Sequence, residues 1–215
     1  DTTIVINANP TKGSLVVNAD GTVDYTHDGS ETVSDSFTYT IDDNDSATSN
    51  VATVNITITP VNDRPVANDD SGATTEGGTV VIDLAANDTD VDGSINDASI
   101  SISTGPNNGS VVVNGDGTVS YTHDGSETVS DSFNYTIDDN NGATSNIAAV
   151  TITITEVNDP PQAVADLATV AEGGTVNINL AANDTDIDGS INLATITLST
   201  SPTNGSVVIN PNGTV

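Results

Sequence analysis

The sequence predicts an all-β protein built from tandem β-sandwich repeats, and three observations support this. Apolar residues alternate with Ser, Thr and Asn, which is the period of half-buried strands. Asn-Gly and Asp-Gly pairs, which favour tight turns, separate these alternating segments at short intervals. The segment 13–43 returns at 109–139 and differs at only four of 31 positions. A fixed shift of 96 residues indicates a repeat array, and 96 residues suffice for one small core.

The repeat also sets the expected domain organisation. The block AANDTDVDGSIN at 85–96 returns almost unchanged at 181–192. The junctions 61–65 and 157–161 contain proline, which ends a strand and stiffens a link. We therefore expect the C-terminal part of one repeat in 1–60, a complete sandwich in 61–157 and the N-terminal part of the next repeat in 158–215. We also expect a fragment whose two partial repeats are poorly ordered unless something supplies their missing strands.

In the complete repeat, the alternation predicts about seven strands and no helix. The strands are expected at 65–70, 79–84, 98–104, 109–114, 117–122, 131–138 and 146–155. The expected inward side chains are Val80, Ile82, Leu84, Ile100, Ile102, Val111, Val113, Val119, Tyr121, Phe133, Tyr135, Ile137, Val150, Ile152 and Ile154. Seven short strands joined by tight turns in fewer than 100 residues indicate an immunoglobulin-like Greek-key sandwich.

Composition excludes several classes of function. The chain has 31 acidic residues and two basic ones, for a net charge of −29. This charge disfavours binding to nucleic acid and to anionic membranes, which both require Lys and Arg. No apolar run approaches the length of a membrane-spanning helix, and the chain has no Cys. Such a charge opposes compaction, so we expect high external salt or bound divalent cations to neutralise it.

Catalysis has little support in the sequence. It lacks a Cys nucleophile, a Gly-x-Ser-x-Gly elbow and a phosphate-binding glycine loop. His27 and His123 each lie alone in a Tyr-Thr-His-Asp-Gly segment, so we interpret them as turn residues. The acidic residues recur with the repeat, which favours a repeated structural ion site over an active site. We therefore predict that the chain is not an enzyme.

The most specific acidic motif is Asp-Thr-Asp-Val-Asp-Gly. It places Asp88, Asp90 and Asp92 at alternate positions before a glycine, and Asp184, Asp186 and Asp188 repeat the pattern. Three carboxylates spaced in this way can converge on Ca²⁺, which prefers six to eight oxygen ligands. The motif lacks the flanking helices and the twelfth-position Glu of an EF-hand. A solvated acidic turn without an ion is the alternative.

The order and spacing of three motifs carry a family resemblance. The Val-Asn-Asp-x-Pro junction, the Asp-rich loop about 27 residues later and the DGSE…SDSFxYTIDD block resemble the cadherin-like tandem repeats of large RTX-type bacterial surface adhesins. That resemblance implies Ca²⁺ held between repeats. By position, the first junction at Asn62 and Asp63 would collect Glu31, either Asp42 or Asp43, and Asp90 with Asp92. The second junction at Asn158 and Asp159 would collect Glu76, Glu127, either Asp138 or Asp139, and Asp186 with Asp188. The short Asn-Asp linker leaves the number of ions open.

These observations favour one function and leave another open. The first is an extracellular structural extender of a bacterial adhesin involved in biofilm, in which Ca²⁺ stiffens the contacts between neighbouring repeats. The alternative is a self-assembling matrix or filament subunit, in which strands complete sandwiches between identical chains. A carbohydrate-binding module is disfavoured, because the chain has no Trp and its few Tyr and Phe residues occupy expected core positions.

Overall fold

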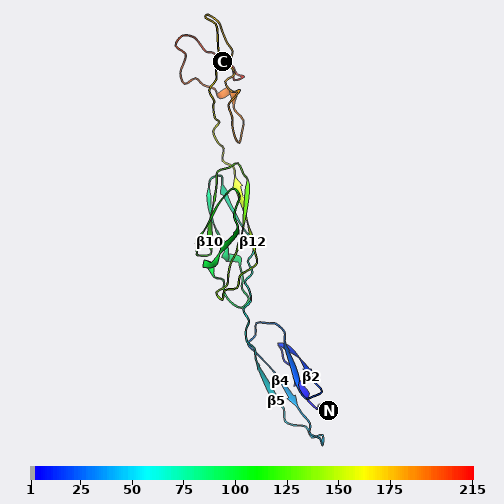
Figure 1. The fold of residues 1–215 in the computed structure, drawn as a ribbon. Coiled ribbons are helices and arrows are strands. Elements are labelled where there is room, and N and C mark those ends of the chain that lie inside the picture. Colours follow the sequence, from blue (N-terminus) through cyan, green and yellow to red (C-terminus); the bar gives the residue numbers. More distant parts are fainter. Residues whose placement is uncertain (1–2) are drawn as a thin grey trace.

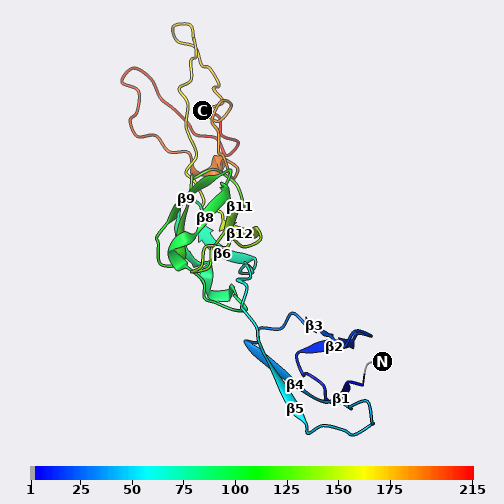
Figure 2. The same ribbon diagram turned by 60° about the horizontal axis from the view of Figure 1, so that its bottom comes forward.

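The computed structural model describes residues 3–215. Three parts follow one another along the chain, with the two termini at opposite ends (Figure 1). The middle part, in green, is a two-layer sandwich, while the first part has fewer strands and the last consists mostly of loops (Figures 1 and 2). Among the described residues, no helix is long and apolar enough to cross a membrane.

The middle repeat forms the sandwich from seven strands in two sheets. One sheet has the order β6-β12-β11-β8, with bounds Asp70–Thr75, Ala148–Thr155, Ser130–Thr136 and Ser101–Thr104. The other has the order β7-β10-β9, with bounds Thr79–Asp83, Thr118–His123 and Gly109–Val113. The β6–β12 pair is parallel and the other pairs are antiparallel. The predicted all-β sandwich of seven strands is confirmed.

The core lies between these sheets and follows the predicted alternation. Its most deeply buried side chains are Leu84, Val119, Tyr121, Phe133, Tyr135, Ile137, Val150 and Ile152. Val113 was expected to point inward but is exposed. It ends β9, which is the edge strand of its sheet, so no neighbouring strand covers its outer side.

The first strand of the middle repeat lies later in the sequence than predicted. The segment 65–70 was expected to be a strand, but β6 begins at Asp70, and Val66 forms only an isolated bridge with Thr89. Side chains bond the backbone here instead: Ala67 N–H donates to Asn146 Oδ1 at 3.0 Å. The polar segment DSGATT carries almost no apolar alternation, so the pattern did not reveal it.

The first part repeats the later strands of the middle repeat. Its strands are β1 (Val5–Ala8), β2 (Gly13–Val17), β3 (Val23–His27), β4 (Ser34–Thr40) and β5 (Ala52–Thr57), paired as β1-β4-β5 and β2-β3. Residues 3–60 contain no counterparts of β6 and β7. Their side chains are correspondingly less covered: Ile41 is 45% exposed, whereas its counterpart Ile137 is 0% exposed.

The last part contains little regular structure. Residues 158–215 hold one 3₁₀ turn, η3 (Leu193–Thr195), and two isolated bridges. Leu167 is 99% exposed there. Two further 3₁₀ turns, η1 (Ala85–Asn87) and η2 (Asp97–Ser99), lie in loops of the middle repeat. Within residues 3–215, helical structure is limited to these three short turns.

A carboxylate fastens the same loop in both repeats. Asp131 accepts hydrogen bonds from Asn107 N (3.1 Å), Asn108 N (2.8 Å) and the Tyr121 hydroxyl (3.0 Å). Asp35 accepts the equivalent bonds from Thr11 N, Lys12 N and the Tyr25 hydroxyl. The loop before β2 or β9 is thus tied to the start of β4 or β11.

Candidate metal site at the repeat junctions

Carboxylates from four segments meet at the second junction. The β6–β7 turn supplies Glu76, the β10–β11 loop supplies Glu127 and the linker supplies Asp159. Their ligand oxygens all lie within 4.8 Å of one another. The backbone N–H of Asp159 donates to Asp188 Oδ2 at 3.0 Å, which brings in the Asp-rich loop of the last part. The cluster therefore joins two repeats.

The electrostatics of this cluster favour a cation. Partial desolvation and the neighbouring carboxylates of Glu76, Asp188 and Asp159 raise the pKa of Glu127. Glu127 Oε2 is buried and accepts no hydrogen bond. An acceptor oxygen that is buried without a donor destabilises the fold, and more so when it is charged. Clustered anions around such an oxygen fit a hard cation such as Ca²⁺.

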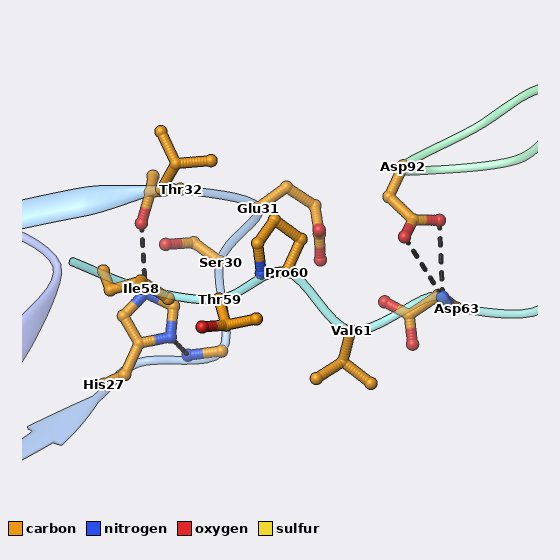
Figure 3. A pocket seen from close by; sticks show the side chains of 12 residues that line it. His27, Ser30, Glu31, Thr32, Ile58, Thr59, Pro60, Val61, Asp63 and Asp92 are labelled. Carbon is orange, nitrogen blue, oxygen red and sulfur yellow. Dashed lines mark hydrogen bonds between the residues drawn. The ribbon is translucent and has the colours of Figure 1, made fainter.

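The first junction repeats much of this arrangement. Asp63 N–H lies 3.3 and 3.2 Å from the two carboxylate oxygens of Asp92. In Figure 3 the Glu31 carboxylate extends beside Pro60, on the side of the linker that leads to Asp63 and Asp92. Desolvation, followed by the charges of Asp63 and Asp92, raises the pKa of Glu31.

The acidic pair after β11 lies at the opposite end of the repeat from its predicted place. Asn62 Nδ2 donates to Asp139 Oδ2 at 2.7 Å, so Asp139 belongs beside the first junction and its assignment to the second is wrong. Glu127 precedes β11 and Asp139 follows it, and a seven-residue strand separates its ends by roughly 20 Å. Asp138 shares this end, where its backbone N–H donates to Ser99 Oγ at 2.7 Å.

The equivalent pair in the first repeat also lies away from the predicted junction. Asp42 and Asp43 follow β4, whereas Glu31 precedes it. Asp43 Oδ1 accepts the N–H groups of Asp45 and Ala47 at 2.9 and 2.8 Å, which closes a local turn. The backbone N–H of Asp42 donates to Thr3 Oγ1. By the same strand-length argument, neither residue gathers with Glu31.

The Asp-rich loop divides its carboxylates between two places. Asp92 and Asp188 face the junctions, while Asp88 lies inward, 3.1 Å from the Tyr135 hydroxyl. Asp90 Oδ2 is buried without a hydrogen-bond partner, and a Cβ at Gly93 would approach it to 2.7 Å, so a larger residue there would displace this carboxylate.

The remaining predicted residues make local backbone contacts. Asp184 Oδ1 accepts the N–H of Val164 at 2.7 Å, and Asp186 Oδ1 accepts that of Gly189 at 3.1 Å. Asn158 Nδ2 donates to the carbonyl of Asp159 at 3.0 Å. These contacts shape the loops of the second junction without adding carboxylates to the cluster of Glu76, Glu127 and Asp159.

The strand prediction missed a partly buried acidic pair, Asp70 and Asp88, behind the loop. The Tyr135 hydroxyl lies 3.1 Å from Asp70 Oδ2 and from both carboxylate oxygens of Asp88, and it also contacts two backbone carbonyls. One hydroxyl proton cannot serve all these acceptors. Burial, opposed by the Tyr135 hydrogen bond and reinforced by Asp88, raises the pKa of Asp70 to about 6. Asp70 and Asp88 therefore compete for the one hydroxyl proton of Tyr135.

Comparisons with known proteins place the chain in a family. The bacterial cadherin-like domain matches residues 1–60 and 62–156, and the bacterial Ig domain matches 158–215. Such domains are typically non-enzymatic structural modules and suggest extracellular, adhesin-type repeats of a bacterial surface protein. No curated protein matches significantly.

Several solved structures are distantly similar. Chicken VE-cadherin EC1-2 is 18% identical with a TM-score of 0.36, over 72% of this chain and 85% of that one. InvD of Yersinia pseudotuberculosis is 18% identical with a TM-score of 0.28, over 84% and 57%. An endo-fucoidan hydrolase of glycoside hydrolase family 107 is 18% identical with a TM-score of 0.32, over 72% of this chain and only 23% of its own. At these scores the likenesses carry no argument about activity. The match over most of its length shows that this chain belongs to the bacterial cadherin-like domain family.

Proposed function

We propose that this chain is an extender segment of a secreted or cell-surface bacterial adhesin, and that Ca²⁺ at its junctions stiffens it. The observation that carries the proposal is the meeting of Glu76, Glu127 and Asp159 around a buried oxygen that has no hydrogen-bond partner. Asp188 joins them from the next repeat. Its partners would be neighbouring repeats of the same chain, and its role would be to lengthen the adhesin so that a terminal binding domain is held away from the cell.

The chemistry of the cluster supports Ca²⁺ in particular. All its side-chain donors are carboxylate oxygens, each carboxylate can offer one or two of them, and Ca²⁺ prefers six to eight. The ion would supply positive charge and bridge the two repeats. Without it, four carboxylates repel one another across the linker, and the desolvated Glu127 oxygen remains unpaired. The same residues therefore favour a bent or mobile joint at low Ca²⁺.

The expected strength of the effect follows from linkage. Extracellular modules bind Ca²⁺ with dissociation constants of roughly 10⁻⁴–10⁻³ M. At a hundredfold excess of Ca²⁺ over that constant, one site stabilises the fold by about 2.7 kcal/mol. This is a large share of the 5–15 kcal/mol, in order of magnitude, that holds a small domain folded.

Thermal unfolding with Ca²⁺ and with chelator tests the proposal directly. The midpoint should rise by several degrees with Ca²⁺, and Glu127→Gln should remove most of this rise. The control is Asp83→Asn, since Asp83 is an exposed carboxylate on β7 outside the cluster, and this variant should keep the full response. Small-angle scattering should show a longer and stiffer particle with Ca²⁺. The proposal would be overturned if the melting midpoint of the unchanged chain were the same with Ca²⁺ and with chelator.

A further inference from the structure

A buried imidazole lies behind the carboxylates of the second junction. The His123 side chain is 0% exposed. Its Nδ1 lies 3.1 Å from Gly77 N and 3.3 Å from Gly125 N, and its Nε2 lies 2.9 Å from Thr128 Oγ1. Both ring nitrogens are therefore hydrogen-bonded within the protein, to partners from two separate turns.

These partners define the state of the ring. A backbone N–H can only donate, so Nδ1 must present its lone pair to Gly77 and Gly125. The proton of the neutral ring then sits on Nε2, which donates to Thr128 Oγ1. One edge of the imidazole thus accepts from the β6–β7 turn while the other donates to the β10–β11 loop.

Both turns carry a carboxylate of the cluster. Gly77 directly follows Glu76, and Thr128 directly follows Glu127. The His123 backbone adds a further tie, because its N–H donates to the Gly78 carbonyl at 3.0 Å. The His123 ring makes no hydrogen bond to the carboxylate of Glu76 or Glu127. It does link the two turns that carry these residues, and the spacing of the turns sets the distance between the two carboxylates.

We propose that His123 is a positioning residue for the junction ion site, holding the turns of Glu76 and Glu127 at the separation that lets both carboxylates face one cation. The inference rests on the proposed function and adds a residue that makes no contact with the ion. Partners that hydrogen-bond metal ligands directly change affinity about 10–100-fold when they are replaced, so a residue acting one step further away should fall at the low end of this range, about tenfold.

The equivalent ring of the first repeat keeps the hydrogen bonds within its own loop. His27 keeps the bonds to Gly29 N (3.3 Å) and Thr32 Oγ1 (3.0 Å). Residues 3–60 provide no counterpart of Gly77, and the His27 side chain is 23% exposed. In the middle repeat, the bond to Gly77 adds a contact with the second ligand-bearing turn to these loop bonds.

Three substitutions separate positioning from simple packing. His123→Asn keeps an acceptor near the place of Nδ1, His123→Gln reaches only toward the place of Nε2, and His123→Leu keeps neither. Calorimetric titration of the 215-residue chain with Ca²⁺ gives the affinity, and thermal unfolding in chelator gives the stability of the ion-free fold. The control is Ile152→Val, which weakens the core without touching either turn.

The expected result is an order of affinities. His123→Leu and His123→Gln should weaken Ca²⁺ binding about tenfold or more, while His123→Asn should recover most of the affinity. Ile152→Val should lower the melting midpoint in chelator and leave the affinity unchanged. Circular dichroism at the titration temperature verifies that each variant is folded.

Two outcomes overturn the inference in distinguishable ways. If the unchanged chain binds Ca²⁺ and His123→Leu binds it equally well, or His123→Asn weakens binding as much as His123→Leu, then His123 does not position the site. If the unchanged chain does not bind Ca²⁺ and Glu127→Gln behaves identically, the proposed function itself fails and this inference falls with it.

Discussion

Replacement of Asp131 by Asn should destabilise the middle repeat strongly. Asp131 Oδ2 accepts from Asn108 N and the Tyr121 hydroxyl, and Oδ1 accepts from Asn107 N and Ser132 N. In the Asn variant, one of the two oxygens becomes an NH₂ group that faces two donors. Two charge-assisted hydrogen bonds are lost at about 1.5 kcal/mol or more each, so the free energy of unfolding should fall by about 3 kcal/mol.

The acid dependence of unfolding should change with it. Burial alone would raise the pKa of Asp131, but the N–H groups of Asn108, Asn107 and Ser132 hold it below its ordinary value. A lowered pKa means that the carboxylate stabilises the fold above the unfolded-state pKa. This stability is lost as pH falls through the folded-state pKa, below about pH 4. Asp131→Asn should therefore flatten the acid limb of the stability curve.

Urea unfolding followed by near-ultraviolet circular dichroism measures both effects. Asp35→Asn is the matched variant, since Asp35 makes the same set of bonds in the first repeat but is less buried. Its effect should be smaller than that of Asp131→Asn. An Asp131→Asn variant within about 0.5 kcal/mol of the unchanged chain, which is the range of ordinary surface substitutions, would refute the reasoning.

Three further predictions follow from single contacts. Burial raises the pKa of Asp70 to about 6, so its protonated form favours folding below the unfolded-state pKa near 4, and this contribution is lost as pH rises through 6. Asp70→Asn should therefore raise the free energy of unfolding by roughly 1 kcal/mol at pH 7. Equal melting curves for the variant and the unchanged chain would contradict this. Gly72→Ala should cost about 1–3 kcal/mol in urea unfolding, because its Cβ would lie 2.7 Å from Ile82 Cδ1, whereas Gly105→Ala meets open space and serves as control. Glu127→Gln removes a charge from the cluster, so in chelator it should melt at or above the midpoint of the unchanged chain; a lower midpoint would count against carboxylate repulsion.

Most of the sandwich was accessible to sequence reasoning. Six of its strands, β7 to β12, carry apolar residues at every second position, and this local pattern is sufficient to place them. β6 was misplaced because its residues are small and polar. Its position depends on parallel pairing with β12 and on the close approach of Gly72 to Ile82, which are contacts between distant segments.

The candidate site was only partly accessible. The repeat and the family resemblance pointed to Glu76, Glu127 and Asp159, and the structure brings these carboxylates together. The same reasoning assigned Asp139 to the wrong end, because a list of acidic residues does not say which side of a strand each one lies on. Strand direction separates Asp139 from Glu127.

Two further residues gained their roles only in the fold. The sequence offers His123 as a turn residue and Asp70 as the end of a strand. The structure buries the first between two turns and places the second beside Tyr135. No local signal marks either one, since their partners are as many as 65 positions away.

Period and alternation are properties of neighbouring residues, and they were enough to establish an all-β fold, a 96-residue repeat and a recurring set of acids. The tertiary structure alone decided which acids meet, because the ends of each strand lie at opposite ends of the sandwich and only chain direction assigns a carboxylate to one junction or the other. Burial added the second distinction. Desolvation and the neighbouring carboxylates raise the pKa of Glu127, and its buried Oε2 has no hydrogen-bond partner, which sets it apart from the other acids.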